Sequence, residues 1–269
     1  NPAPVAVVRD RLYATRSTAV FALDARTGEE RWVVEPPVET SRLTAPAVAD
    51  DTVYVVGQHP ERAPTLWALA TPDGSVRWRV ALGGESAGPP VVVDDRAYCV
   101  TTNGGLYAVA TGEAAVAWEQ SLEPAVGPPA ATGDGVFVGT RAGVACYDAD
   151  GAERWRASNS TALDSPHDGP VLDDATVYAG GPGGESLVAL AVDSGEERWR
   201  ASLSGDPRAP VVTADSLYVQ DSTGEIAAVS RTDGSVAWST RLSLRSMTGI
   251  TAGDDGLYVG ADDRLLRYD

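Results

Sequence analysis

The feature that most constrains this chain is a phrase that recurs six times, in which a turn glycine is followed by a few polar residues and a tryptophan. Successive tryptophans of the phrase stand 37 to 46 residues apart. Five copies keep a spacing of four between glycine and tryptophan, and the third, from Gly112 to Trp118, is longer by two. A fixed period of about 40 residues is typical of repeat architectures, in which each repeat is one supersecondary unit.

A second pattern interleaves with the first and divides each repeat into short strands. A run of small apolar residues usually follows a proline, then comes an Asp- or Gly-rich turn, then an alternating stretch such as "VYVV", and seven copies are present. A third apolar stretch recurs at 20–25, 65–70, 105–110 and 187–192, and the tryptophan lies in a fourth. No sustained helical period is visible, so we expect essentially no helix. Four short antiparallel strands every ~40 residues indicate a β-propeller blade.

The fold class predicted is therefore all-β, a seven-bladed β-propeller of four-stranded antiparallel blades. There are seven copies of the first three strands and six of the fourth, so the last blade is expected to lack its outer strand. The alternative is an eight-bladed propeller from which one blade has been trimmed. We predict a single domain over 1–269, with blades at approximately 3–34, 44–80, 88–120, 127–157, 168–201, 208–240 and 248–269.

The stretch "FALDARTGEERW" (Phe21–Trp32) resembles the Ala-x-Asp-x-x-x-Gly-x-x-x-Trp docking motif of the pyrroloquinoline-quinone (PQQ) repeat propellers, and the similarity covers the whole chain. Ala70 and Ala191 replace the aspartate in two copies, and the fourth copy is shorter by one residue. The resemblance implies that each tryptophan docks over the neighbouring blade, behind its turn glycine. The docking residues implied are Trp32, Trp78, Trp118, Trp155, Trp199 and Trp238.

The Glu-Glu-Arg that precedes the tryptophan varies between copies. It becomes Ser-Val-Arg at 75–77 and Ser-Val-Ala at 235–237. We interpret these three positions as solvent-facing and without a specific role. Pairs of aspartates recur in the turn between the first two strands, where Asp favours turn formation.

Quinone-dependent dehydrogenases of this family resemble one another in an adjacent pair of cysteines, a Ca²⁺ site and an eight-bladed ring. Here Cys99 and Cys146 are far apart in sequence and fall in different blades. Sheets that face one another are about 10 Å apart, and a disulfide needs Cα atoms within about 7 Å, so we expect free, buried thiols. We predict no cofactor, no metal and no catalytic residues, hence no enzyme.

The charge of the chain limits its partners. There are 38 acidic and 21 basic residues, a net charge of −17, and no lysine. Duplex nucleic-acid binding needs a basic footprint, so we expect no nucleic-acid partner. No run of 18 apolar residues is present, so direct membrane insertion is not expected. The composition resembles that of proteins from extreme halophiles, the alternative being a genome rich in G and C that favours arginine codons.

Ligands of propellers usually meet the face formed by loops that enter the first strand and loops that join the second strand to the third. In this chain the loops at 34–43, 57–64, 158–169 and 180–186 are long. Asp168 and Arg208 occupy equivalent positions on adjacent blades, and form either a solvated salt bridge or a polar ligand site. His167, near Asp164 and Asp168, is more simply a loop histidine than a metal ligand. The candidate ligand-face residues are Arg42, His59, Arg62, Asp164, His167, Asp168 and Arg208.

Two functions follow from this sequence. The first is a non-enzymatic scaffold that binds a protein, peptide or glycan on its loop face, with a cell-surface or extracellular location favoured. The alternative is a quinoprotein-like oxidoreductase or another enzyme that acts at the channel. Because a fold does not imply a function, the choice depends on the site.

Overall fold

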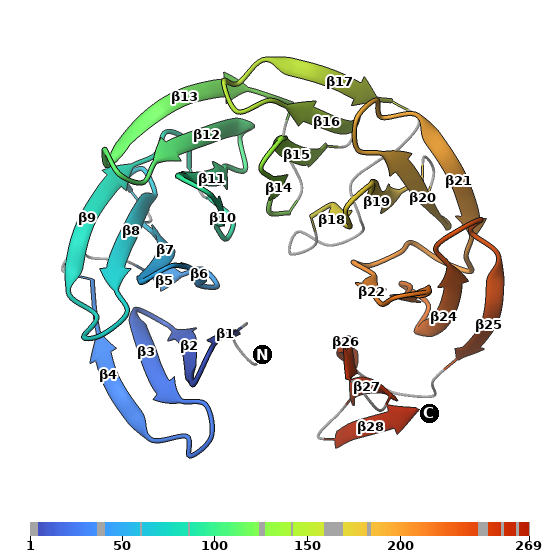
Figure 1. The fold of residues 1–269 in the computed structure, drawn as a ribbon, viewed down its shortest axis with the longest axis horizontal. Coiled ribbons are helices and arrows are strands. Elements are labelled where there is room, and N and C mark those ends of the chain that lie inside the picture. The colour runs from blue at the N-terminus through green and yellow to red at the C-terminus, as the bar shows by residue number, and fades with distance from the viewer. Residues whose placement is uncertain are drawn as a thin grey trace. The chain divides into compact units, whose positions relative to one another are not determined.

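The computed structural model of the protein describes residues 5–36, 41–59, 61–85, 87–123, 127–140, 142–158, 169–181, 184–241, 247–253, 256–261 and 264–268. These residues form strands, turns and loops, and no helix occurs among them. The strands make seven antiparallel sheets (Figure 1), and consecutive strands are neighbours in all of them except the second along the chain, where two short strands both pair with the same longer strand. The prediction of an all-β, seven-bladed propeller is confirmed, and we call the sheets blades 1 to 7 in chain order.

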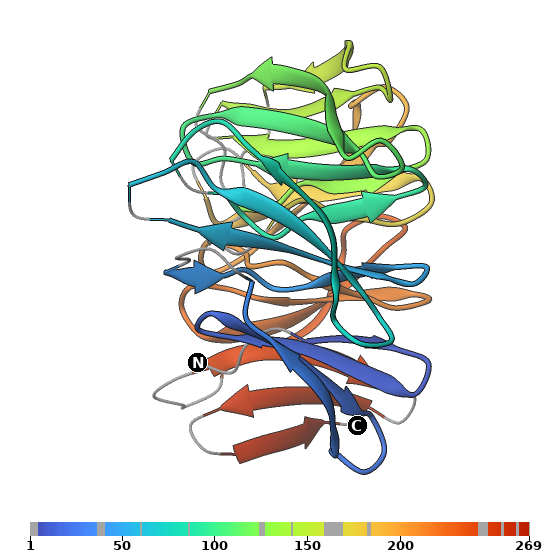
Figure 2. The same cartoon turned by 90° about the vertical axis from the view of Figure 1, so that its left-hand side faces the viewer.

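The first three blades contain thirteen strands. Blade 1 comprises β1 (Val5–Val8), β2 (Arg11–Arg16), β3 (Ala19–Asp24) and β4 (Glu30–Val34). Blade 2 comprises β5 (Arg42–Leu43), β6 (Ala47–Ala49), β7 (Thr52–Gln58), β8 (Thr65–Ala70) and β9 (Val76–Ala81). Blade 3 comprises β10 (Val91–Val93), β11 (Arg96–Val100), β12 (Gly105–Ala110) and β13 (Ala115–Ser121). Figure 2 shows the strands of blade 1, in blue, joined by short turns.

The remaining blades contain fifteen strands. Blade 4 comprises β14 (Ala130–Thr132), β15 (Gly135–Thr140), β16 (Gly143–Tyr147) and β17 (Glu153–Ala157). Blade 5 comprises β18 (Val171–Leu172), β19 (Thr176–Gly180), β20 (Ser186–Ala191) and β21 (Glu197–Ser202). Blade 6 comprises β22 (Val211–Val212), β23 (Ser216–Gln220), β24 (Glu225–Ser230) and β25 (Val236–Arg241). Blade 7 has three strands among its described residues, β26 (Met247–Gly253), β27 (Gly256–Ala261) and β28 (Arg264–Tyr268).

The chain divides into two compact units. The first contains the residues up to Val136 together with Tyr147–Ala152, and the second contains Phe137–Cys146 and the residues from Glu153 onward. Blades 1 to 3 therefore belong to the first unit, and blades 5 to 7 belong to the second.

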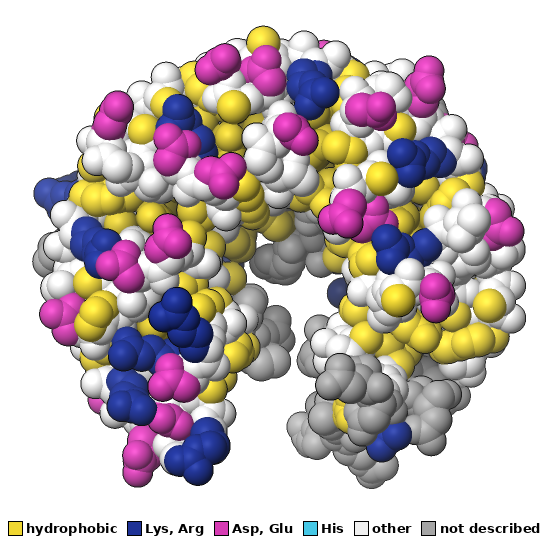
Figure 3. Space-filling view, in the orientation of Figure 1, with side chains coloured by type: hydrophobic (Ala, Val, Ile, Leu, Met, Phe, Trp, Pro, Cys, Tyr) yellow, Lys and Arg dark blue, Asp and Glu magenta, His cyan; other side chains and the backbone are white. Residues whose placement is uncertain are grey.

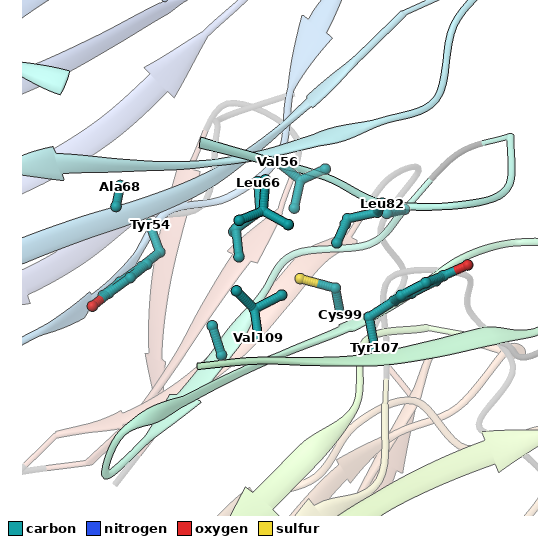
Figure 4. Close-up of a cluster of buried hydrophobic side chains, with 11 residues drawn as sticks. Tyr54, Val56, Leu66, Ala68, Leu82, Cys99, Tyr107 and Val109 are labelled. Carbon is teal, nitrogen blue, oxygen red and sulfur yellow. The ribbon is translucent and has the colours of Figure 1, made fainter. Parts of the chain in front are cut away.

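Apolar side chains of adjacent blades pack into continuous cores. Between blades 2 and 3, residues of β7, β8, β11 and β12 form one buried cluster, shown in Figure 4, in which Leu66, Cys99 and Val109 are fully buried. Burying one such side chain contributes about 1.5–3 kcal/mol relative to leaving it exposed. Burial also raises the pKa of the Cys99 thiol to about 12, so this cysteine remains a protonated, apolar core residue. Cys146 is likewise free and buried.

Trp32, Trp118, Trp155 and Trp199 dock as the family resemblance implies, while the docking of Trp78 and Trp238 stays a prediction. The indole N–H of Trp32 in blade 1 donates to the carbonyl of Thr71 in blade 2 at 2.9 Å, and its ring covers Gly74. A Cβ atom built on Gly74 would lie only 2.8 Å from that ring. The same arrangement joins Trp118 to Ala149 and Gly151, Trp155 to Val192 and Gly195, and Trp199 to Arg231 and Gly234.

Blade 3 corrects the predicted docking turn. Gly112 does not have a positive φ, and no atom lies within 4 Å of where its Cβ would be. The left-handed position is occupied by Ala114, with φ of 54°, whose N–H donates to Ala110 as the corresponding turn glycines do in other blades. Ala114 stands four residues before Trp118, so the third copy keeps the common spacing and an alanine replaces its glycine.

The arginine before the tryptophan is not merely solvent-facing, which corrects a second interpretation. Arg31 Nη2 lies 2.6 Å from Asp24 Oδ2 within blade 1. Hydrogen bonds from the Thr27 backbone and from Arg31 hold the pKa of Asp24 below its usual range. In blade 2, Arg77 pairs with Asp51. The arginine therefore fastens the outer strand of a blade to the turns of the same blade.

Candidate functional site

Three of the predicted ligand-face residues come together at one end of blade 2. Arg42 begins β5, a two-residue strand that pairs with the end of β7, so that Arg42 lies opposite Gln58. His59 directly follows β7, and its Nδ1 accepts the backbone N–H of Glu61 at 3.0 Å. Arg62 is exposed in the loop between β7 and β8. Strand β5 was not foreseen, because its two residues lie in a stretch with the composition of a loop.

Strand β5 also fixes this end of blade 2 against blade 1. The N–H of Leu43 donates to the carbonyl of Ser17 at 2.9 Å. Just beneath, the buried hydroxyl of Thr15 donates to the carbonyl of Thr44 at 2.9 Å, and the N–H of Val56 donates to the Thr44 hydroxyl at 3.1 Å. Because Ser17 directly follows Arg16 at the end of β2, these bonds place Arg16 and Arg42 on the same rigid support.

Most described arginines already have partners. Seven form ion pairs with Asp or Glu, and Arg79 stacks over the ring of Trp67 at 5.4 Å. By contrast, the exposed side chains of Arg16, Arg42 and Arg62 make neither an ion pair nor a hydrogen bond with any residue that the structure describes. We call these three residues the arginine face.

The arginine face is suited to binding carboxylates. A guanidinium group offers five N–H donors in a planar fork that matches a carboxylate with two parallel hydrogen bonds. Elsewhere in this protein, Asp51 occupies such a fork on Arg77, with N–O distances of 2.9 and 2.6 Å. On the arginine face, the corresponding donors point to solvent and are available to a partner.

The other predicted residues are less fully defined. Arg208 in blade 6 is exposed, and its backbone N–H donates to the carbonyl of Gln220 at 2.8 Å. Asp164, His167 and Asp168 lie outside the described residues, so both the salt bridge from Asp168 to Arg208 and the histidine interpretation remain predictions. Across the described part of the chain, no three His, Cys, Asp or Glu side chains are grouped as a metal site would require.

The second unit carries a cleft that sequence reasoning missed. It lies between blades 5 and 6, has a volume of about 540 Å³, and is lined mainly by the β18–β19, β22–β23 and β24–β25 turns. Its centre is an ion pair between Arg231 and Asp173 at 2.6 Å, to which Tyr178 donates a hydrogen bond, also at 2.6 Å. A smaller cavity of about 160 Å³ occupies the equivalent place between blades 1 and 2.

The hydrogen bonds in this cleft perturb its titratable groups. Burial alone would raise the pKa of Asp173, but hydrogen bonds from Tyr178, from the Ala175 N–H and from Arg231 outweigh it and lower the pKa. Burial, with the hydrogen bond to Asp173, raises the pKa of Tyr178. At neutral pH the centre of the cleft is therefore a closed ion pair, and any ligand must be recognised by the groups around it.

The chain is similar to known proteins over nearly its whole length. It matches the family described as "Outer membrane protein assembly factor BamB" through residues 2–59, 16–240 and 140–267. The BamB of Yersinia pestis is 28% identical over 278 residues, covering 95% of this chain and 70% of that protein. The crystal structure of BamB from Moraxella catarrhalis superposes with a TM-score of 0.71 at 21% identity, covering 95% of this chain and 78% of that one.

The fold itself is widely shared. The computationally designed protein Ika8 superposes with a TM-score of 0.84 at only 13% identity, over 98% of this chain and 82% of its own. Likeness at such low identity supports the fold alone, whereas the family match spans residues 2–267. The chain thus belongs to the BamB family of PQQ-like repeat propellers.

Proposed function

We propose that this protein is a non-enzymatic scaffold that binds a protein partner through the arginine face. The supporting observation is that Arg16, Arg42 and Arg62 are exposed and unpaired while most other described arginines are engaged within the fold. The BamB relatives are named assembly factors, which favours a binding role over the alternative of a quinoprotein-like oxidoreductase or another channel-sited enzyme.

The contact segment of the partner is expected to be acidic. The chain carries −17 charges, so a basic partner would be attracted to much of its surface without a preferred place. An acidic segment finds the strongest local attraction where several unpaired arginines share one end of a blade pair, as on the arginine face, and this gives the contact its specificity. A neutral glycan would gain little from three guanidinium groups, so a protein or peptide ligand is favoured over a glycan.

Site-specific photocrosslinking in cells tests the proposal and identifies the partner. A photoreactive amino acid replaces Arg42 or Arg62, and in control cells Arg26, an exposed residue of the β3–β4 turn in the same unit. We expect one protein to crosslink from positions 42 and 62 and not from position 26. Equal crosslinking from all three positions, or none from 42 and 62, contradicts the proposal.

Purified components then test the role of charge. The Arg42→Glu/Arg62→Glu variant is compared with Arg9→Glu/Arg26→Glu, which changes the net charge by the same amount at exposed positions away from the arginine face. Reversing two interface charges is expected to raise the Kd for the crosslinked partner at least roughly tenfold, with a smaller effect at high salt. A Kd that both double variants change equally shows that only net charge matters and overturns the assignment of the site.

A further inference from the structure

Blade 2 contains an ion pair at the positions that correspond to charged residues of the cleft between blades 5 and 6. There, Arg77 on β9 makes an ion pair with Asp51 in the β6–β7 turn, and the same guanidinium donates to the Thr52 hydroxyl at 3.1 Å. The hydrogen bond from Arg77 lowers the pKa of Asp51, which keeps this carboxylate ionised. One blade thus supplies both the cation and the anion, and each neutralises the other.

Blade 5 keeps the cation and has lost the anion. Strand pairing aligns Tyr178 with Tyr54 and Thr176 with Thr52, so Arg198, before Trp199, corresponds to Arg77. Arg198 Nη1 donates to the Thr176 hydroxyl at 3.2 Å, as Arg77 does to Thr52. Ala175 stands where Asp51 stands in blade 2, and Arg198 makes no ion pair within the described chain.

Blade 6 shows the reverse loss. Asp215 directly precedes Ser216, the first residue of β23, and so corresponds to Asp51. The position before Trp238 is Ala237, so blade 6 has no arginine there. The Asp215 carboxylate has neither a hydrogen bond nor an ion pair with the residues described. An unpaired cation on one blade and an unpaired anion on the next therefore line the same cleft.

The remaining charged groups of the cleft do not cancel this arrangement. Arg231 and Asp173 neutralise each other, and two further hydrogen bonds from Arg231, each 2.7 Å long, go to the carbonyls of Thr213 and Ala214. Asp174 is exposed at the rim and adds a second carboxylate to that of Asp215. The cleft thus offers one free guanidinium with a neighbouring hydroxyl, and two free carboxylates.

We propose that this cleft binds a zwitterion, namely a free amino acid or the termini of a short peptide. The ligand carboxylate lies on Arg198 and the Thr176 hydroxyl, as Asp51 lies on Arg77 and Thr52 in blade 2. The ammonium group lies on Asp215, with Asp174 beside it. A volume of about 540 Å³ accommodates either ligand. This site lies in the second unit and shares no residue with the arginine face, which lies in the first, so it does not depend on the proposed function.

Four small probes test the charge requirement by NMR titration of the whole protein, with the backbone amides of 175, 176, 198 and 215 as reporters. Glycine and triglycine carry both charges, at short and long separation, while acetate and methylammonium carry one each. We expect one of the two zwitterions to bind at least roughly tenfold more tightly than either singly charged probe, because it gains two charge-assisted contacts. The preferred member of the pair distinguishes a free amino acid from a peptide.

Variants test the residues assigned. Arg198→Gln and Asp215→Asn should each weaken binding of the preferred zwitterion by about tenfold. Arg26→Gln, which removes an exposed arginine in the other unit, should leave it unchanged. Ala175→Asp restores the anion found in blade 2 and should also weaken binding, since it pairs with Arg198. The proposal is overturned if acetate or methylammonium binds as tightly as the zwitterions, if Arg198→Gln has no effect, or if no probe shifts the reporters at about 100 mM.

Discussion

At the scale of single residues, the fold depends on pairs formed by a turn residue and the tryptophan of the preceding blade. Gly28 and Gly74 share the same φ of +72°, in the left-handed region that side chains rarely adopt. Their surroundings differ, because nothing lies within 4 Å of a Cβ on Gly28, whereas one on Gly74 would meet the docked ring of Trp32. Substitutions at these two glycines therefore distinguish the cost of the left-handed backbone from the cost of filling the space that the tryptophan ring occupies.

Gly28→Ala and Gly74→Ala should differ markedly in stability. Gly28→Ala introduces only the left-handed backbone cost, about 1–2 kcal/mol. Gly74→Ala adds overpacking against Trp32, typically a further 1–3 kcal/mol. Urea unfolding of both variants measures the difference. Equal losses would mean that the Trp32 ring moves aside without cost, and that docking contributes little.

At the scale of strands, the sequence predicted those strands that are bounded by local turn residues. The third strand of blade 2 was expected at 65–70 and is observed there as β8, because turn residues bound each apolar run and the repeats align. Strand β5 was missed because its pairing with β7 is non-local. Sequence reasoning assigned the left-handed turn position of blade 3 to Gly112 and not to Ala114, because alanine gives no turn signal in a sequence.

The candidate sites were only partly predictable. Arg42 and Arg62 could be predicted as ligand-face residues because their loops are long. The structure shows in addition that their side chains have no partner among the described residues. Arg16 was missed, since it ends a strand and its loop is short. The cleft between blades 5 and 6 depends on which copy of the repeat lost Asp and which lost Arg. That loss is visible in sequence only after the register shows that Ala175 and Ala237 occupy the positions of an ion pair.

The turn between β18 and β19 makes a prediction about acid sensitivity. Asp173 has a lowered pKa when folded, so its contribution to stability is present above the unfolded value of about 3.9 and is lost as pH falls through the folded value. Asp173→Asn should cost about 1–3 kcal/mol at pH 7, since it leaves Arg231 without its charge partner. It should also flatten the acid limb of the stability curve.

Asp174→Asn is the matched control for this variant. Asp174 is the exposed neighbour of Asp173, and it makes no hydrogen bond or ion pair with the described residues. Thermal unfolding between about pH 6 and pH 3 should show a wild-type profile for Asp174→Asn and a shallower one for Asp173→Asn. A wild-type acid limb in Asp173→Asn would mean that the ion pair with Arg231 adds nothing to stability.

At the scale of the whole molecule, the balance of charge is the dominant property. Figure 3 shows acidic and arginine side chains interspersed over the face in view, so many charges have a nearby counterion. The excess is nonetheless −17, and the calculated isoelectric point is about 4.4. Surface ion pairs contribute only about 0–1 kcal/mol each and weaken with salt, while the excess charge destabilises the compact state through repulsion.

Salt weakens both the stabilising ion pairs and the destabilising repulsion, so its two effects on stability oppose each other. At about 0.1 M salt the Debye length is roughly 10 Å and the excess carboxylates repel, whereas at about 1 M it is roughly 3 Å and that repulsion is largely screened. We expect the melting temperature at pH 7 to rise between these concentrations of KCl, as measured by scanning calorimetry.

Near pH 4.4 the net charge vanishes. The rise should then be much smaller, because repulsion no longer has to be screened. A rise of the same size at both pH values would assign the effect to salting-out of apolar surface, and a fall at pH 7 would mean that the ion pairs outweigh the repulsion.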